Sequence, residues 1–268
     1  MPINDHSLIT IITVTYNSAT IIEQTILSVI SQTYPHIEYI IIDGGSTDGT
    51  IDIIKKYSDR ITYWISEPDK GIYDAMNKGI KKATGKWINF MNCGDTFYDN
   101  YVIENIHNNI NKNIDIIYGN TNLVYSFGSY ILKAEKDVSS KQYMPFCHQS
   151  SFTNSNLMKR YGYDLQYKIC ADRNFFYTAY KNHASYEYLD IVISNYEAES
   201  GVSANNLQQA FYEMGLIEGK TDLFKWKLKY FVVSIYSKVL IFAKRNLPTS
   251  IFQFIRKQKV KSFTEHSS

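Results

Sequence analysis

The chain has 268 residues, of which 44% are hydrophobic and 20% are charged, a composition typical of a folded protein with a full core. This length allows one large domain with an appendage. The three cysteines, Cys93, Cys147 and Cys170, are scattered and odd in number, which argues against a disulfide framework or a zinc site and favours a reducing compartment.

The charge is divided unevenly along the chain. Residues 220–261 carry eleven Lys and Arg side chains against one acid, Asp222, a local net charge of +10; since the whole chain carries +2, the remainder carries −8. A basic tail on an acidic body requires a partner. The change in composition predicts a main domain over residues 1–219 and a basic amphipathic helical tail over residues 220–268. No apolar run in the tail reaches the ~20 residues of a transmembrane helix, and the first residues lack the features of a signal peptide.

The first 95 residues alternate strands and helices at the spacing of βαβ units. Four β-branched, apolar segments are predicted as strands: Leu8–Thr15, Ile37–Ile42, Ile61–Ser66 and Trp87–Met91. The predicted connecting helices are Ala19–Ser31, Ile51–Tyr57 and Gly71–Lys82. This order is typical of a Rossmann-like, mononucleotide-binding half-sheet in an α/β protein.

Beyond residue 110 the pattern is mixed. The further predicted strands are Ile114–Tyr118, Tyr130–Ala134 and Tyr188–Ile193. The further predicted helices are Ala171–Lys181, 203–219, 222–243 and a last one that begins at Pro248.

Polar side chains follow the first two predicted strands at the carboxyl edge of the sheet, where ligands of open α/β sheets bind. The aromatic ring of Tyr16, beside the hydroxyl of Thr15, can stack on a base, and the carboxylate of Asp43 can accept hydrogen bonds from a base imide or a ribose. The alternatives are that Tyr16 only packs and that Asp43 caps the glycine-rich turn over residues 43–49.

The turn after the first strand also excludes two classes of nucleotide-binding protein. It lacks the Gly-x-Gly-x-x-Gly that a dinucleotide-binding fold places there. It equally lacks the glycine-rich, basic loop that a sugar-nucleotide pyrophosphorylase needs.

Asp74, Asn77 and Lys78 lie early in the third predicted helix at i, i+3 and i+4, so they share one face. A carboxylate, an amide and a cation near a helix N-terminus suit a sugar diphosphate. The alternative is a solvated helix face with a capping acid.

Two further acids follow the same logic. The fourth strand ends in Asn92-Cys93-Gly94-Asp95, which presents Asp95 as an oxygen ligand for a hard cation, unless the segment is an ordinary polar turn. Asp172 opens a predicted helix, where it either complements the helix dipole, a benefit of about 0.3–1 kcal/mol, or serves as a general base.

Several stretches together resemble the family-2, inverting glycosyltransferases of bacterial polysaccharide assembly, which have the GT-A fold. The matching stretches are residues 11–17, 28–34, 40–50, 69–79 and 92–95, with a looser match from Cys147-His148-Gln149 to Ala171-Asp172. The resemblance covers about residues 7–195.

This resemblance implies a role for each candidate residue. Contacts to the nucleotide sugar are implied for Thr15, Tyr16, Asp43, Asp69, Asp74, Asn77 and Asn92. Asp95 would be the terminal acid of the D-x-D motif and bind Mg²⁺ or Mn²⁺, and Asp172 would be the catalytic base. His148 is interpreted as an acceptor or diphosphate contact, with a further metal ligand or a simply packed side chain as the alternatives. The chain departs from the pattern at Gly44, where many relatives have a second Asp, and at Asn92, where the D-x-D motif has an acid.

The implied reaction is transfer of a hexose, with Glc or Gal favoured, from a UDP-sugar to a polyprenyl-pyrophosphate-linked sugar in O-antigen or capsule synthesis. The tail then predicts a peripheral enzyme on the anionic cytoplasmic face of the inner membrane, with no nucleic-acid partner. The alternative for the tail is that its first helix packs on the catalytic domain. The alternatives for the function are a GDP-sugar or UDP-GlcNAc donor, and a catalytically inactive sugar-nucleotide-binding partner of a membrane complex.

Overall fold

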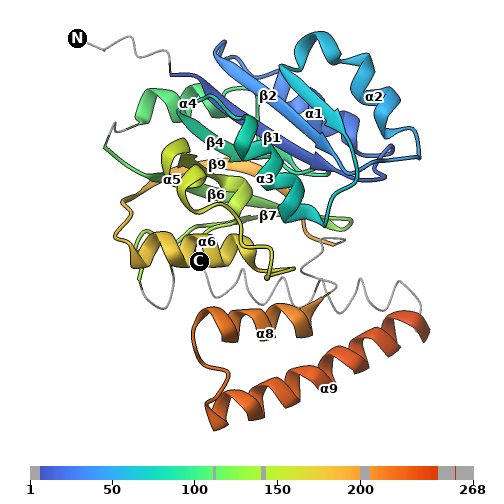
Figure 1. Ribbon diagram of the computed structural model, residues 1–268, viewed down its shortest axis with the longest axis vertical. Helices are drawn as coiled ribbons and strands as arrows, with labels where there is room; N and C mark the ends of the chain where they lie inside the picture. Colours follow the sequence, from blue (N-terminus) through green and yellow to red (C-terminus); the bar gives the residue numbers. More distant parts are fainter. Residues whose placement is uncertain (1–6, 111–112, 140–142, 200–205, 247–256, 258–268) are drawn as a thin grey trace. The chain divides into compact units, whose positions relative to one another are not determined.

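A computed structural model describes residues 7–110, 113–139, 143–199, 206–246 and 257 (Figure 1). The contacts within the chain divide it into two compact units. Unit 1 is Met1–Leu123 with Ile131–Glu197, and unit 2 is Val124–Tyr130 with Ala198–Ser268.

A mixed sheet of nine strands forms the framework, in the order β3-β2-β1-β4-β8-β6-β9-β5, with β7 paired to β6. The strands are β1 (Ile9–Thr15), β2 (Ile37–Asp43), β3 (Tyr63–Ser66), β4 (Trp87–Phe90), β5 (Thr96–Phe97), β6 (Ile116–Tyr125), β7 (Gly128–Leu132), β8 (Ser151–Asn154) and β9 (Tyr186–Glu197). Strands β1 to β4 are parallel, whereas β8 runs antiparallel to both β4 and β6. The parallel part is the half-sheet that the sequence predicts.

Helices cover both faces of the parallel strands (Figure 1). The helices of unit 1 are α1 (Ile22–Ile30), α2 (Thr50–Lys56), α3 (Ile72–Lys82), α4 (Val102–Asn109), α5 (Ser155–Tyr161) and α6 (Ala171–Lys181), with short 3-10 helices η1 (Ser58–Arg60) and η2 (His148–Ser150). Ile9 and Ile11 of β1 pack in one cluster with apolar residues of α1, α2 and α4. Ile12, which points to the opposite face, contacts α3 at Gly79. Every residue of β1 is therefore buried, as a strand covered on both faces must be.

Over residues 206–246 of unit 2, aromatic packing joins helix α8 (Leu207–Ile217) to helix α9 (Phe224–Asn246). The ring of Trp226 lies against Gly215, where a Cβ atom would collide with it, and it stacks on Phe211 with ring centroids 5.8 Å apart. Gln208 donates a hydrogen bond to the hydroxyl of Tyr230 at 3.0 Å. In residues 206–246 and the other described segments, no helix is long and apolar enough to cross a membrane.

The compact units divide at residue 198, whereas the composition predicts a boundary at residue 220. The reason is the aromatic contacts just described, which join α8 to α9 and leave the predicted boundary between two helices of the same unit. The helix predicted to begin at Pro248 lies outside the described residues, apart from position 257.

Candidate active site

The carboxyl ends of the parallel strands bring the predicted residues to one edge. Thr15 is in register with Asp43 on β2, and Asp43 with Ser66 on β3. The chain after β4 continues beside β1, because the amide of Cys93 donates to the carbonyl of Val14 at 3.3 Å. The Asn92–Asp95 turn therefore lies next to the end of β1, as the sequence predicts.

Tyr16 and Asp69 meet over Gly44. A Cβ atom at Gly44 would lie 2.6 Å from Oδ2 of Asp69 and 3.3 Å from the ring of Tyr16. Tyr16 is 63% exposed, so one aromatic face is available at the end of the strand. Asp69 accepts a hydrogen bond from the amide of Gly71 at 2.7 Å. The absence of a side chain at Gly44 leaves room for this arrangement.

Asp43 is fully buried and organises the turn that follows β2. Its Oδ2 atom accepts hydrogen bonds from the amides of Gly45 (3.1 Å) and Ser46 (2.8 Å) and from the hydroxyl of Ser66 (2.6 Å), and its Oδ1 atom accepts one from the hydroxyl of Ser46. A carboxylate offers about four acceptor sites, and four donors occupy them. This geometry matches the turn-capping alternative.

The predicted face of α3 is divided among three separate partners. Asp74 accepts a hydrogen bond from the amide of Lys70 at 3.0 Å, and Lys78 pairs with Glu67 at 2.8 Å. The side-chain amide of Asn77 both donates to and accepts from the backbone of Tyr163, at 2.7 and 2.8 Å. Asn77 thus ties α3 to the segment before α6 instead of presenting a free amide.

Asp95 is 5% exposed and is held on both oxygens. Oδ2 accepts a hydrogen bond from Nε2 of Gln149 at 2.7 Å, and Oδ1 accepts one from the amide of Glu197 at 3.0 Å. Burial raises the pKa of Asp95 to about 6, and these hydrogen bonds offset the cost of burial only in part. A buried carboxylate of this kind favours a bound cation.

Asp172 begins α6, and its side chain is 17% exposed. Its Oδ1 atom accepts hydrogen bonds from the amide of Arg173 (2.8 Å) and the hydroxyl of Tyr73 (3.0 Å). Its Oδ2 atom lies 3.2 Å from Nδ1 of His148. Burial by itself raises the pKa of Asp172, but the hydrogen bonds that it accepts from His148, Arg173 and Tyr73 outweigh this effect and hold the pKa below its ordinary value. Asp172 is therefore a carboxylate at neutral pH.

His148 also reaches the turn after β4. Its Nε2 atom lies 2.9 Å from Nδ2 of Asn92. Since Nδ1 faces Asp172, both ring nitrogens are engaged, and neither is left to bind a metal ion in this arrangement. The Oδ1 atom of Asn92 is buried and has no hydrogen-bond partner within the residues that the structure describes.

The donor set of the Asn92–Asp95 turn fits a hard divalent cation. The carboxylate of Asp95 and the unpartnered Oδ1 atom of Asn92 are both oxygen ligands, which Mg²⁺ and Mn²⁺ prefer. Across the described residues, no group of three or more His, Cys, Asp or Glu side chains is arranged to hold a metal. A cation here needs oxygens from a bound diphosphate and from water, as Mg²⁺ sites on phosphates commonly have.

Two residues that the sequence argument did not single out complete the site, Gln149 on Asp95 and Tyr73 on Asp172. Both lie in stretches that carry the resemblance, beside His148 and Asp74 respectively. Their position beside these candidate residues is the only sequence feature that points to a role in the site. The acids that they contact lie 54 and 99 residues away in the chain, for Gln149 and Tyr73 respectively.

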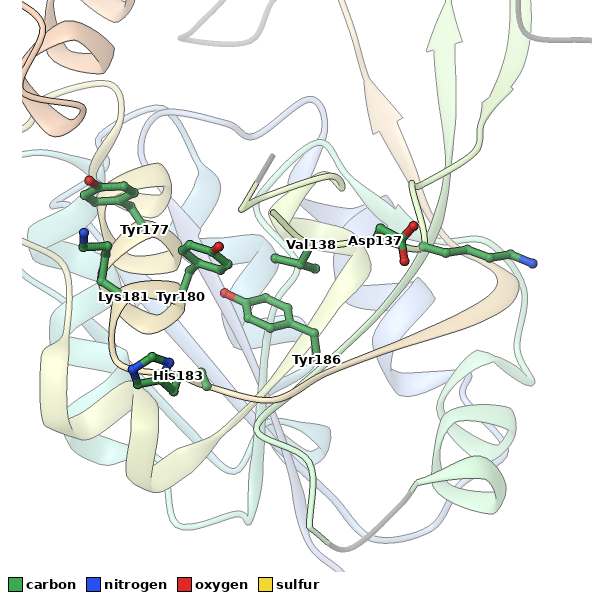
Figure 2. Close-up of a pocket in the computed structure, with 9 residues that line it drawn as sticks. Asp137, Val138, Tyr177, Tyr180, Lys181, His183 and Tyr186 are labelled. Atoms are coloured by element: carbon green, nitrogen blue, oxygen red, sulfur yellow. The ribbon is translucent and has the colours of Figure 1, made fainter. Parts of the chain in front are cut away.

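A separate cavity of about 870 Å³ lies at the opposite end of α6, lined by Tyr177, Tyr180, Lys181 and Tyr186 among others (Figure 2). Lys181 follows Asp172 by nine residues on this helix, which places the two about 13 Å apart along its axis. This cavity is thus distinct from the strand-end site, and we assign the chemistry to the strand-end site because the buried carboxylates gather there.

The fold is GT-A-like, with buried acids at the carboxyl edge of its parallel strands. Residues 10–189, more than half of the chain, match the profile of glycosyl transferase family 2. The chain belongs to this family. It is similar to the PGL/p-HBAD biosynthesis glycosyltransferase of Mycobacterium tuberculosis (strain ATCC 25177 / H37Ra), with 27% identity over 212 residues, which are 76% of this chain and 82% of that protein.

Solved structures share the GT-A fold at low sequence identity. TarS 1–349 of S. aureus in complex with UDP-GlcNAc superposes with a TM-score of 0.67 at 19% identity over 78% of this chain. The match spans only 65% of that TarS chain. Mannosyltransferase PcManGT from Pyrobaculum calidifontis, in complex with GDP-Man and Mn²⁺, gives a TM-score of 0.62 at 14% identity over 96% of this chain and 81% of that one.

Proposed function

We propose that the protein transfers a hexose, with inversion, from a UDP-sugar to a lipid-pyrophosphate-linked sugar acceptor in O-antigen or capsule synthesis. Glc and Gal are the favoured sugars. The observation that carries the proposal is Asp172, an ionised carboxylate at a helix start, linked through His148 to the turn that carries Asp95.

The chain's own residues support a direct displacement. The exposed ring of Tyr16 stacks on the uracil, with Asp69 beside it for the ribose. Asp172 accepts the proton of the acceptor hydroxyl at a carboxylate oxygen as that hydroxyl attacks the anomeric carbon, and general-base help of this kind contributes ~10²–10⁴-fold. Attack from the face opposite the leaving UDP inverts the anomeric centre, and no covalent enzyme intermediate is needed.

Asp95, with Asn92 in the same turn, would hold Mg²⁺ or Mn²⁺. When bound, the cation supplies positive charge against the leaving diphosphate. We expect Asp95→Ala to abolish the Mn²⁺-dependent part of UDP binding, measured by calorimetry. UDP binding with unchanged Mn²⁺ dependence in this variant would remove Asp95 from the metal site.

The two solved structures hold different donors, UDP-GlcNAc in TarS and GDP-Man in PcManGT. A panel of UDP- and GDP-sugars with Mn²⁺, followed by slow donor hydrolysis, tests the proposed donor. We expect hydrolysis of UDP-Glc or UDP-Gal to be fastest. Faster hydrolysis of UDP-GlcNAc or a GDP-sugar would replace the proposed donor, and no hydrolysis of any donor would favour an inactive binding partner.

Asp172→Asn tests the catalytic base. Turnover should fall by ~10²-fold or more while UDP binding stays near normal. The matched control is Asp52→Asn, because the Asp52 side chain is 84% exposed on α2 and its carboxylate pairs with Lys55 of the same helix. Wild-type turnover in Asp172→Asn would remove this residue from the mechanism, and loss of UDP binding in a folded variant would give it a structural role.

The membrane part of the proposal rests on α9. One side of this helix packs on α8 through Trp226 and Tyr230. Large apolar side chains spaced by three or four residues form a stripe on another side, and all of them are exposed: Phe224, Leu228, Phe231, Ile235, Val239 and Phe242. No acid occurs in residues 224–246. By helical spacing, Lys225 and Lys229 fall on one side of the stripe and Lys227 and Lys238 on the other.

An apolar stripe between rows of lysines suits the headgroup region of an anionic bilayer, where each cation contributes about 1 kcal/mol. Such attachment would bring the active site to a lipid-linked acceptor. The test is flotation with vesicles that contain anionic lipid, at low and high salt, comparing the full chain with a Phe231→Gln/Phe242→Gln variant. The full chain should float, less at high salt, and the variant should not.

The control for flotation is Leu132→Gln, which removes an exposed apolar side chain from β7 instead. Equal flotation of the stripe variant and this control would refute membrane binding through α9. If neither floats and the full chain is a dimer that the stripe variant disrupts, the stripe is an interface between two copies.

A further inference from the structure

We propose that His148 is a positioning residue, which orients Asp172 and ties it to the turn that receives the donor diphosphate. The inference rests on the proposed function, since it takes Asp172 as the base. It goes beyond that function because it assigns His148 neither to the acceptor nor to the metal.

The direction of the hydrogen bond between Asn92 and His148 determines which ring nitrogen of His148 carries the proton. The Nδ2 atom of Asn92 lies 2.9 Å from Nε2 of the ring. An amide nitrogen only donates, so this contact is a hydrogen bond when Nε2 is the acceptor, which in a neutral imidazole places the ring proton on Nδ1. The Nδ1 atom faces Oδ2 of Asp172 at 3.2 Å. Asn92 thereby selects the tautomer that presents a donor to the carboxylate.

The two oxygens of Asp172 are held by different donors, and His148 is the donor to Oδ2. The amide of Arg173 and the hydroxyl of Tyr73 both reach Oδ1 of Asp172. Among the residues that the structure describes, His148 lies within reach of Oδ2, with Nδ1 at 3.2 Å. Its ring is 16% exposed and engaged at both nitrogens, so its orientation is fixed. Donors on both oxygens hold the carboxylate in one rotamer, which is the condition for a base that must meet an acceptor hydroxyl.

The short helix η2 also holds Asp95, the second acid of the site. Gln149, the next residue of η2, donates to Oδ2 of Asp95 at 2.7 Å. His148 and Gln149, consecutive residues of η2, therefore contact Asp172 and Asp95 respectively. Asn92, in the same turn as Asp95, contacts His148. A change at the Asn92–Asp95 turn when the donor binds would be passed to Asp172 through His148.

This arrangement gives a physical reason for Asn at position 92 in place of an acid. An ionised Asp at this position is an acceptor only and has no proton to give to Nε2. A neutral ring could then donate to only one of the two carboxylates and would face the other with an unprotonated nitrogen, unless a second proton made it an imidazolium. The Asn92 amide avoids this conflict, and its Oδ1 atom stays available to the donor site.

A matched pair of substitutions separates the two ring nitrogens. The amide nitrogen of His148→Asn reproduces a donor at the position of Nδ1, whereas the amide oxygen of His148→Gln reproduces an acceptor at the position of Nε2. We expect His148→Gln to lower kcat at least about tenfold, because a hydrogen bond to a charged group is lost, with KM for the donor and UDP affinity changed less than about twofold. His148→Asn should keep several times more of the wild-type kcat than His148→Gln.

The ring tautomer provides a readout that needs no turnover. In ¹⁵N spectra of the wild-type protein with labelled histidine, the signal assigned to His148 through the His148→Asn variant should report a protonated Nδ1 and an unprotonated Nε2. In the Asn92→Asp variant this pattern should be lost.

Two results would overturn the inference: equal kcat in the His148→Gln and His148→Asn variants, or a wild-type ring protonated on Nε2 alone. A failure of the proposed function is distinguishable from both. It would appear as wild-type protein that turns over no nucleotide sugar, or as unchanged turnover in Asp172→Asn, whatever the tautomer of His148.

Discussion

Gln149 donates a hydrogen bond from Nε2 to Oδ2 of Asp95 across 2.7 Å. This contact holds a carboxylate that is 5% exposed, at the point where the chain leaves the central strand β4. The hydrogen bond does not fully compensate the charge, because burial still raises the pKa of Asp95 to about 6. When no cation is bound, the buried negative charge of Asp95 therefore lowers the stability of the folded protein.

The stability of the metal-free protein should therefore depend on pH through Asp95. The folded-state pKa of about 6 lies above the ordinary value of 3.8, so the folded protein binds this proton more tightly than the unfolded chain does. The free energy of unfolding should then decrease as pH rises from about 4 to about 6 and level off above that range.

Asp95→Asn removes this ionisation and keeps the shape of the side chain. In urea unfolding with EDTA, the stability of the variant relative to the wild type should rise by on the order of 2 kcal/mol between pH 4 and pH 7.5. Any cost of replacing an acceptor oxygen by an amide nitrogen should be the same at both pH values. A difference that is the same at both pH values would contradict the assignment of the shift to this residue.

Tyr16 should contribute to UDP affinity and not to stability. A stacked base is worth about 1–3 kcal/mol in alanine substitutions, so Tyr16→Ala should weaken UDP binding by roughly 5- to 150-fold in calorimetry. Because Tyr16 is 63% exposed, its thermal unfolding should stay close to that of the wild type. Tyr16→Phe is the control and should bind UDP within about twofold of the wild type. Unchanged affinity in Tyr16→Ala would leave the ring as ordinary surface.

Asp43 should behave in the opposite way. Its four hydrogen bonds come from the turn and from Ser66, and Asp43→Asn replaces one acceptor oxygen by a donor. The loss should lower the free energy of unfolding by about 2–3 kcal/mol, with UDP affinity of the folded protein little changed. A stable variant that loses UDP affinity would instead assign the carboxylate to the base.

The strand-end residues were predictable because of the geometry of parallel sheets. Their strands are continuous buried runs, so the residue that ends each run lies at the common carboxyl edge. The sheet geometry alone therefore predicts that Thr15, Asp43 and Asp95 lie at one edge, and the strand register and the contact of Cys93 with Val14 agree with this. It needs only the local sequence and the parallel register.

The partners of these residues were not predictable, because each comes from a distant segment. Asn77 contacts the backbone of Tyr163, 86 residues away, and no local pattern distinguishes this use from a free amide on a helix face. The short elements α4, β8 and α5 were missed for a related reason. They have four to eight residues each, which is too few for a helical or strand period to stand out.

The last prediction concerns the packing of α3 on β1. A Cβ atom at Gly79 would lie 2.6 Å from Cγ2 of Ile12, closer than carbon atoms approach in proteins. In an exposed helix, Gly→Ala stabilises by roughly 0.5–1 kcal/mol. Here the overlap in a packed core should outweigh that gain and lower the free energy of unfolding by about 1–3 kcal/mol.

The partner substitution is the control for this prediction. Ile12→Ala alone should cost about 2–5 kcal/mol, because Ile12 is fully buried and leaves a cavity. The double variant Gly79→Ala/Ile12→Ala should cost less than the sum of the two single variants, since the new methyl group occupies part of that space. Urea unfolding of the four proteins measures the coupling. Additive losses, or a more stable Gly79→Ala protein, would show that α3 can move away from β1, and that the strand-end site does not depend on this close approach.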